Sequence, residues 1–193
     1  MVEFPPLMPS ARWFATFLQA YAKGMTVSDS IIFANSDLSS SRDFGRFLIL
    51  GSQCSPVTLS VAVEGGGRQL RYPDKIMELK LSEHGDWRKN HLKAMEACLG
   101  RKPYFPYIFP YLSGIYLDKN LQTLQDFNNE IFKFLFKFIL GNINNSEISR
   151  FYNNEILGKR GQEVSSDINP EISIFEVISN FGKESLIGFL AMK

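Results

Sequence analysis

Cysteine and histidine are both scarce in this sequence, with two of each among 193 residues. Two cysteines cannot form the disulfide framework of a small secreted protein, and two histidines cannot fill a typical zinc site without further ligands. The histidines, His84 and His91, show neither H-x-x-x-H nor H-E-x-x-H spacing. We therefore expect no metal bound by side chains of this chain, and the sequence indicates no cofactor.

A long apolar run and an excess of charge of one sign are also missing. The longest apolar stretch, at 131–140, is interrupted by Lys133 and Lys137, whereas a spanning helix needs roughly 20 largely apolar residues. The first 14 residues contain no basic segment followed by an apolar one, so we predict no secretory signal. The net charge of +1 indicates neither a nucleic-acid nor a membrane partner. We expect a cytoplasmic, thiol-reducing location, with Cys54 as an incidental surface thiol.

The composition that remains is that of a folded globular chain, 45% hydrophobic and 21% charged. Its length fits a single domain spanning 1–193. Residues 141–169 contain six asparagines and little apolar periodicity, so we expect a flexible loop region there. Residues 68–140 carry twelve basic and eight acidic side chains. This excess is either a solvated helical surface or a groove for a phosphate or carboxylate.

Hydrophobic periodicity predicts a mixture of helices and short strands. Helices are expected at 10–23, 86–99 and 121–140, with a last one capped by Asn169-Pro170-Glu171 and broken by Gly182. Pro106 and Pro110 predict two short helical pieces. Strands are expected at 30–34, 44–50, 57–63 and 75–81, the middle two forming a hairpin, with one more near 147–152. The predicted fold class is α/β, a single domain with a small mixed sheet and four to six helices. An α+β arrangement with an antiparallel sheet is the alternative.

The most informative helix is the one at 86–99, because its apolar face includes a histidine. Trp87, His91, Met95 and Cys98 share that face, which we expect to pack against the helix at 121–140, while Arg88 lies to its side. A histidine in this position is either a structural residue that donates to a carbonyl or a general base at the edge of a pocket. His91 and Cys98 are seven residues apart, about 10.5 Å along the helix, too far for a catalytic dyad.

Three further polar residues have two interpretations each. Asn128 interrupts an apolar stripe of the helix at 121–140 and must bond to backbone or to a ligand. Arg42 and Arg46 lie on one face of an extended segment, as solvated charges or as an anion clamp. The glycines at 65–67 are not followed by Gly-Lys-Ser/Thr, so they do not indicate a phosphate loop.

The string WRKNHLKAMEA at 87–97, followed by Pro103-Tyr104-Phe105, resembles the central signature of the WbqC-like family. That family has a Trp and a His four residues apart and then an aromatic P-[YF]-F string. Its Leu-x-x-[FLY]-Asn pattern is similar to residues 124–128, and its closing segment is similar to residues 169–182. Many members also carry a His-Gln-Pro motif and an Arg-Asn-Arg string, which this chain lacks.

The resemblance implies a role in bacterial surface polysaccharide, such as O-antigen, and a glycine-transferase activity has been suggested for the family. On this basis we predict a transferase of aminoacyl or acyl groups to amino sugars, with His91 as general base. Substrate-binding residues would be Arg42, Arg46, Trp87, Asn90, Tyr104 and Asn128. The expected partner is an anionic small molecule or a nucleotide-sugar. The alternative is a non-catalytic binding or scaffold protein of the same pathway.

Overall fold

The computed structural model describes residues 10–22, 45–51, 54–65, 79–141 and 172–191, together with residues 143, 147 and 168. Its helices are α1 (Ala11–Ala22), α2 (Trp87–Leu99), α3 (Phe105–Leu117), α4 (Leu124–Leu140), α7 (Ile174–Phe181) and α8 (Ser185–Ala191), with the short 3-10 helix η5 (Gly182–Glu184) before α8. Its strands are β1 (Arg46–Ile49) and β2 (Val57–Ser60). Within these residues, no helix has the length and apolar content that crossing a bilayer requires.

The two strands form an antiparallel hairpin in which Phe47 lies opposite Leu59. Phe47 and Ile49 point into the core while Arg46 is exposed, the alternation expected of a strand with one buried face. The hairpin predicted from the sequence is confirmed. The described strands pair antiparallel, as in the α+β form of the prediction, and the fold class of helices around a small sheet is confirmed.

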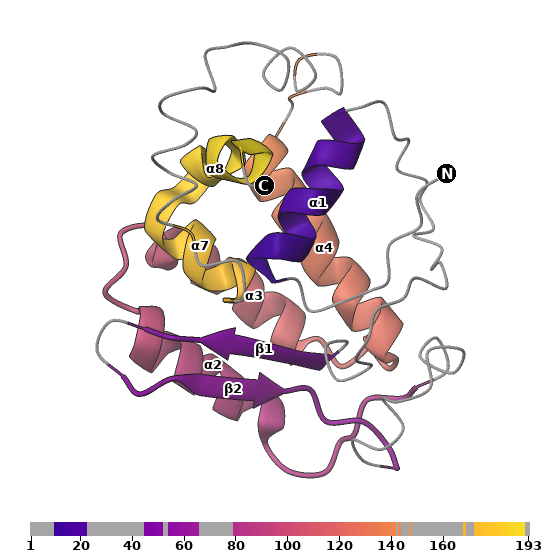
Figure 1. Ribbon diagram of the computed structural model, residues 1–193. Helices are drawn as coiled ribbons and strands as arrows, with labels where there is room; N and C mark the ends of the chain where they lie inside the picture. Colours follow the sequence, from indigo (N-terminus) through magenta and orange to yellow (C-terminus); the bar gives the residue numbers. More distant parts are fainter. Residues whose placement is uncertain are drawn as a thin grey trace.

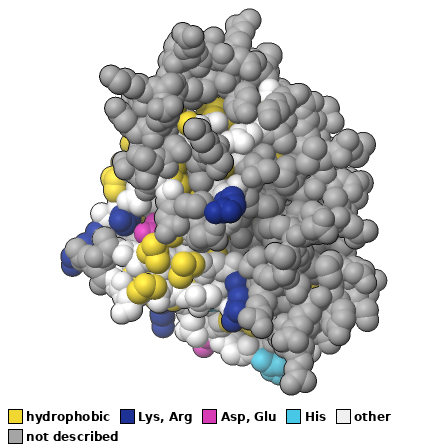
Figure 2. All heavy atoms as spheres, viewed as in Figure 1, with side chains coloured by type: hydrophobic (Ala, Val, Ile, Leu, Met, Phe, Trp, Pro, Cys, Tyr) yellow, Lys and Arg dark blue, Asp and Glu magenta, His cyan; other side chains and the backbone are white. Residues whose placement is uncertain are grey.

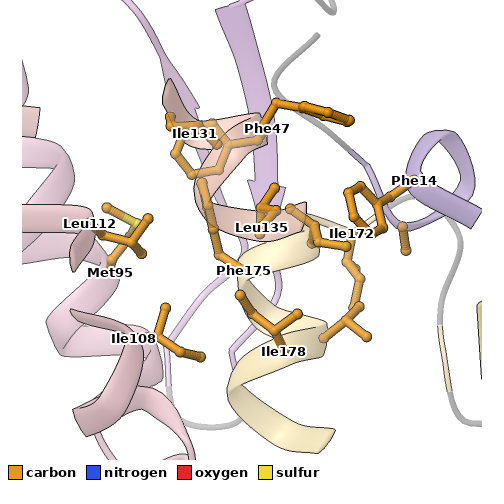
Figure 3. Close-up of a cluster of buried hydrophobic side chains, with 14 of the residues drawn as sticks. Phe14, Phe47, Met95, Ile108, Leu112, Ile131, Leu135, Ile172, Phe175 and Ile178 are labelled. Carbon is orange, nitrogen blue, oxygen red and sulfur yellow. The ribbon is translucent and has the colours of Figure 1, made fainter. Parts of the chain in front are cut away.

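One hydrophobic core connects the described elements. Figure 1 shows the β1–β2 hairpin lying across α2 at one side, with α1, α7 and α8 gathered at the other. Figure 3 shows side chains from both parts meeting in the interior, including Phe47, Met95 and Phe175. The backbone joins the two parts as well, since the Ser173 N–H donates to the Leu48 carbonyl at 2.7 Å. The hairpin is therefore built into the helical core along its buried face.

Helix α4 shows how local sequence sets an element's ends. Thr123 is its N-cap, and its hydroxyl oxygen accepts from the Asp126 N–H at 3.0 Å. Gly141 ends the helix with a φ of 58°, a conformation that glycine adopts without strain. The predicted start at residue 121 was three residues early, because Leu121 precedes the cap. Asn128 is 1% exposed, so its predicted place in the buried stripe is confirmed.

Two predictions about helix boundaries are wrong. The proline-rich segment forms the single helix α3 and not two pieces, with Pro110 inside it. Pro110 removes the donor for the Pro106 carbonyl, but both prolines are exposed, so water can replace that bond. Helix α7 is capped by Ser173, whose hydroxyl oxygen accepts from the Phe175 N–H at 3.2 Å, and not by Asn169.

The expected register of α2 is correct, but its main partner is not. Trp87, Met95 and Cys98 are buried as predicted, and Leu92 is buried with them. Helix α2 packs chiefly on α3, and α3 in turn packs on α4. A contact between α2 and α4 remains at Trp87, whose ring centroid is 5.7 Å from that of Phe127.

Several predictions fall on residues outside the described part. These are the strand at 30–34, the strand near 147–152 apart from residue 147, and most of the loop region at 141–169. Of the strand expected at 75–81, only the last three residues are described. Two of them form isolated bridges, Lys80 with Thr123 and Leu81 with Val63.

Candidate functional site

His91 lies in the second turn of α2 and is 5% exposed. Three aromatic rings contact its imidazole, and a fourth contacts two of those three. The ring centroids of Trp87, Phe47 and Tyr116 lie 5.2, 5.7 and 5.8 Å from that of His91. Phe127 completes the group through contacts with Trp87 and Tyr116. We call Phe47, Trp87, His91, Tyr116 and Phe127 the His91 cluster. Its members come from β1, α2, α3 and α4.

The imidazole is neutral at pH 7. Burial lowers the pKa of His91 from 6.5 to about 4, and a hydrogen bond with the backbone of Ser60 opposes this change in part. The ring Nδ1 is buried and has no hydrogen-bond partner among the described residues. A neutral ring with one engaged nitrogen leaves the other as a lone-pair acceptor. His91 can therefore accept a proton or a hydrogen bond at Nδ1.

Tyr116 adds a second buried polar atom to the cluster. It is fully buried, and its hydroxyl has no hydrogen-bond partner among the described residues. Burial raises the pKa of Tyr116, against the opposing effect of the Arg88 charge, so the phenol stays protonated. Unpartnered polar atoms in a core cost free energy, and a native structure needs a reason to keep them. Two in one cluster mark this region as the candidate site.

Arg88 contacts both the end of α3 and the Trp87 ring of the cluster. Its guanidinium donates to the carbonyls of Tyr116, Asp118 and Leu121 at 3.0–3.1 Å. It also lies 5.1 Å from the ring centroid of Trp87. The prediction that Arg88 lies to the side of the apolar face was wrong, because the end of α3 presents carbonyls that need donors. The fixed guanidinium thereby holds Trp87 and Tyr116 against His91.

The sequence profile of the WbqC-like protein family matches residues 17–186, most of the chain and all of the site just described. The chain belongs to the WbqC-like protein family. No curated protein and no solved structure matches it. The resemblance drawn from the string at 87–97 is thus confirmed, and in this WbqC-like protein that string forms most of α2.

The structure brings together only some of the residues predicted for this WbqC-like site. Trp87 and His91 are in contact, and Asn128 is buried on α4 directly after Phe127. Asn90 is exposed, whereas its neighbour His91 is buried. Arg42 lies outside the described residues.

Arg46 and Tyr104 lie apart from the cluster. Arg46 is exposed on β1, facing away from Phe47, and its Nε donates to the Ser60 hydroxyl at 3.0 Å. Tyr104 precedes α3, whereas Tyr116 is at its other end, about 18 Å along the axis. The Tyr104 N–H donates to the Ser179 carbonyl of α7. These two residues cannot contact the imidazole in this arrangement.

Sequence reasoning missed Phe47, Tyr116 and Glu176. Tyr116 had a usable signal, since Phe105, Ile108, Leu112 and Tyr116 repeat at helical spacing and are all buried. Glu176 is the only charge in an apolar segment, and it is 6% exposed. Its carboxylate accepts from the N–H groups of Leu50 and Gly51 at 2.8 and 3.1 Å. It ties the end of β1 to the first turn of α7.

The expectation for the cysteines was wrong. Cys54, in the connection after β1, forms a disulfide with Cys98 of α2, and their Cα atoms are 5.6 Å apart. Cys54 was expected to be an incidental surface thiol, whereas it is bonded to a cysteine 44 residues away in sequence. Among the described residues, no group of three or more His, Cys, Asp or Glu side chains is placed to hold a metal ion.

Proposed function

We propose that this WbqC-like protein transfers an aminoacyl or acyl group, glycine being the first candidate, to an amino sugar of bacterial surface polysaccharide such as O-antigen. The observation that carries the proposal is the buried, neutral imidazole of His91 with an unengaged Nδ1. Acyl transfer to an amine forms a C–N bond and requires the attacking nitrogen to lose a proton. In this reaction Nδ1 accepts that proton as general base and returns it to the leaving group.

An anionic small molecule or nucleotide-sugar is the proposed ligand, and a cytoplasmic location belongs to the same proposal. Arg46 is exposed and oriented by Ser60, so it is available to a phosphate or carboxylate. On the face shown in Figure 2, the described Lys and Arg side chains are scattered and form no single patch. Anion binding would therefore depend on single arginines, so Arg46→Ala should weaken it more at low salt than at high salt.

A non-catalytic binding or scaffold role is the second candidate. The observation that favours it is the small exposure of His91, 5%, within the cluster of rings. A general base must come within about 2.6–3.2 Å of the proton it removes. A sealed imidazole meets that requirement only if the site opens.

A transfer assay with the His91→Ala protein separates the two candidates. Purified wild type would be incubated with glycyl and acyl donors and a panel of nucleotide amino sugars, with products detected by mass spectrometry. The transferase proposal expects a mass increase with wild type that is lost in His91→Ala and retained in His84→Ala, since His84 is exposed. If ligands raise the melting temperature of the wild type but no donor and acceptor pair reacts, the scaffold role is favoured. Equal transfer by wild type and a folded His91→Ala protein would contradict the role of His91.

A further inference from the structure

We propose that the Cys54–Cys98 disulfide is a redox-sensitive latch that holds the β1–β2 hairpin over His91, and that its reduction by a dithiol exposes the imidazole to solvent. The idea that the latch regulates a catalytic base rests on the proposed function. The idea that reduction changes the access of solvent to His91 is independent of that function and can be tested by measuring access alone.

The hairpin is the cover of His91. Phe47 of β1 lies edge-on to the imidazole, with centroids 5.7 Å apart and an interplanar angle of 83°. The backbone of Ser60, at the end of β2, hydrogen bonds to the same ring. Both strands thus contact the imidazole of His91. If these two contacts are removed, the ring contacts of the imidazole within the described part of the chain are those with Trp87 and Tyr116.

The disulfide fastens this cover to the helix that carries His91. Cys54 belongs to the connection between the strands, and Cys98 lies seven residues after His91, about 10.5 Å along α2. Gly51, which follows β1, also lies next to the end of that helix. A Cβ added to Gly51 would lie 3.3 Å from Cys98 Cβ and 3.4 Å from the Cys98 carbonyl oxygen. Figure 1 shows the β1–β2 hairpin lying in front of α2.

Apart from the hydrogen bond between the Ser60 backbone and His91, the polar anchors of the hairpin described next lead away from α2. Glu176 accepts from Leu50 and Gly51, and the Ser173 N–H donates to Leu48, so β1 is bonded to α7 and its N-cap. Beyond β2, the Ser82 N–H donates to the Ala62 carbonyl at 2.9 Å. None of these bonds is broken by reduction. The reduced hairpin therefore stays attached to α7 while it loses its covalent tie to α2, and the gap that opens is the one over His91.

A dithiol supplies the two electrons and two protons that reduction of the disulfide requires. Cys54 is half-buried and Cys98 is 7% exposed, so the thiolate of the reductant attacks Cys54 Sγ. The Cys98 sulfur leaves as a thiolate and takes up a proton. The second thiol of the reductant then displaces the Cys54 sulfur, which is protonated in turn. Two electrons and two protons pass to the protein, and the dithiol becomes a disulfide. Disulfides are rare in a reducing compartment, and those that occur there are usually transient or redox-sensing, so in the proposed cytoplasmic location this bond would be of that kind.

Diethylpyrocarbonate modification tests the latch, because it reacts with accessible neutral imidazole. His91 is neutral at pH 7 through its lowered pKa of about 4, so its protection reports burial and not charge. His84 is exposed and is the other of the two histidines in the chain, which makes it an internal standard. Modification at each site would be followed by peptide mass spectrometry at pH 7. The samples are oxidised wild type, wild type reduced with dithiothreitol and desalted without oxygen, and the C54S/C98S protein.

The latch predicts that His91 reacts at least tenfold faster in the reduced and C54S/C98S proteins than in the oxidised one, while His84 reacts at one rate in all three. Unchanged protection of His91 after reduction would overturn it. So would faster modification of His91 together with loss of the far-UV circular dichroism signal, because general unfolding would then be the cause. If C54S/C98S does not fold, reduced wild type still decides the question. A missing transfer activity with an accelerated His91 would leave the latch standing and reject the proposed function alone.

Discussion

At the scale of single residues, the site depends on polar atoms placed where water is excluded. His91, Tyr116 and Arg88 are all buried. The two terminal nitrogens of Arg88 donate to the carbonyls at the end of α3, whereas His91 Nδ1, the Tyr116 hydroxyl and Arg88 Nε have no hydrogen-bond partner among the described residues. Desolvation disfavours charge on an imidazole unless an acceptor compensates it. The unengaged atoms of His91 and Tyr116 are therefore consistent with a ligand-binding role, and the three hydrogen bonds of Arg88 with a structural one.

The buried imidazole makes stability depend on pH. The pKa of His91 is about 4 when folded and 6.5 when unfolded, so the unfolded chain binds more protons between these values. Stability is therefore complete above pH 6.5 and is lost as the pH falls toward 4, by about 3 kcal/mol in total. Urea unfolding at pH 7, 6 and 5 should show this loss in wild type. In His91→Gln the loss should be much smaller, since carboxylates common to both proteins cancel. Equal slopes would mean that the ring is solvated.

Two glycines should respond to alanine in opposite directions. Gly182 has a φ of 55°, and an added Cβ would lie 2.7 Å from ring atoms of Tyr104. Gly182→Ala should therefore destabilise the protein by about 1–3 kcal/mol and displace that ring. Gly114 lies inside α3 with nothing within 4 Å of an added Cβ. Gly114→Ala should stabilise the protein by about 0.5–1 kcal/mol. Thermal melts of the pair would test both, and a stabilising Gly182→Ala would contradict the close contact with Tyr104.

At the scale of elements, local sequence patterns correctly predicted those helices and strands that depend on residues close together in the sequence. The hairpin and α2 followed from alternation and from helical spacing, and both were found close to their predicted bounds. The prediction that α3 is divided into two pieces was wrong. Proline inside a helix leaves a carbonyl without its N–H donor, but an exposed carbonyl can bond to water instead. The main partner of α2 was also wrong, since two apolar stripes do not specify which third helix lies between them. Such pairings depend on the whole core.

The junction of α2, α3 and α4 should depend on Arg88 more than on any neighbouring charge. Arg88→Met keeps the apolar stem but leaves the carbonyls of Tyr116, Asp118 and Leu121 without these donors. We expect a loss of about 3 kcal/mol or more in the free energy of unfolding. Lys89→Met is the matched control. Its side chain is 65% exposed and paired with Asp86 at 3.4 Å, so the change should stay within about 0.5 kcal/mol. Similar effects in urea unfolding of the two variants would show that Arg88 is not a brace.

At the scale of the whole molecule, the chain is held together by contacts between residues far apart in sequence. The site needs both β1 and α4 in contact with α2, through Phe47 and Phe127, and Glu176 reaches a strand end 126 residues away. Periodicity in the sequence identifies buried faces but not which of them meet, so Phe47 and Glu176 could not be assigned to the site in advance. The same limit applied to the cysteines, whose approach is a consequence of the hairpin lying across α2.

The disulfide should contribute a measurable part of the global stability. It closes a loop with a sequence separation of 44, and cross-linking a loop of that size lowers the entropy of the unfolded chain by an amount worth about 4 kcal/mol. The C54S/C98S protein should therefore melt roughly 10 °C below oxidised wild type.

Reduced wild type should have the same melting temperature as the C54S/C98S protein. Adding reductant to the C54S/C98S protein should leave its melting temperature unchanged. Thiol titration is the matching chemical measurement, with no reactive thiol in the native protein and two after reduction in denaturant. A melting temperature that is the same for oxidised, reduced and C54S/C98S proteins would mean that the bond adds no stability. Packing and the anchors at α7 would then hold the hairpin over α2, because the disulfide would not stabilise the protein by lowering the entropy of the unfolded chain.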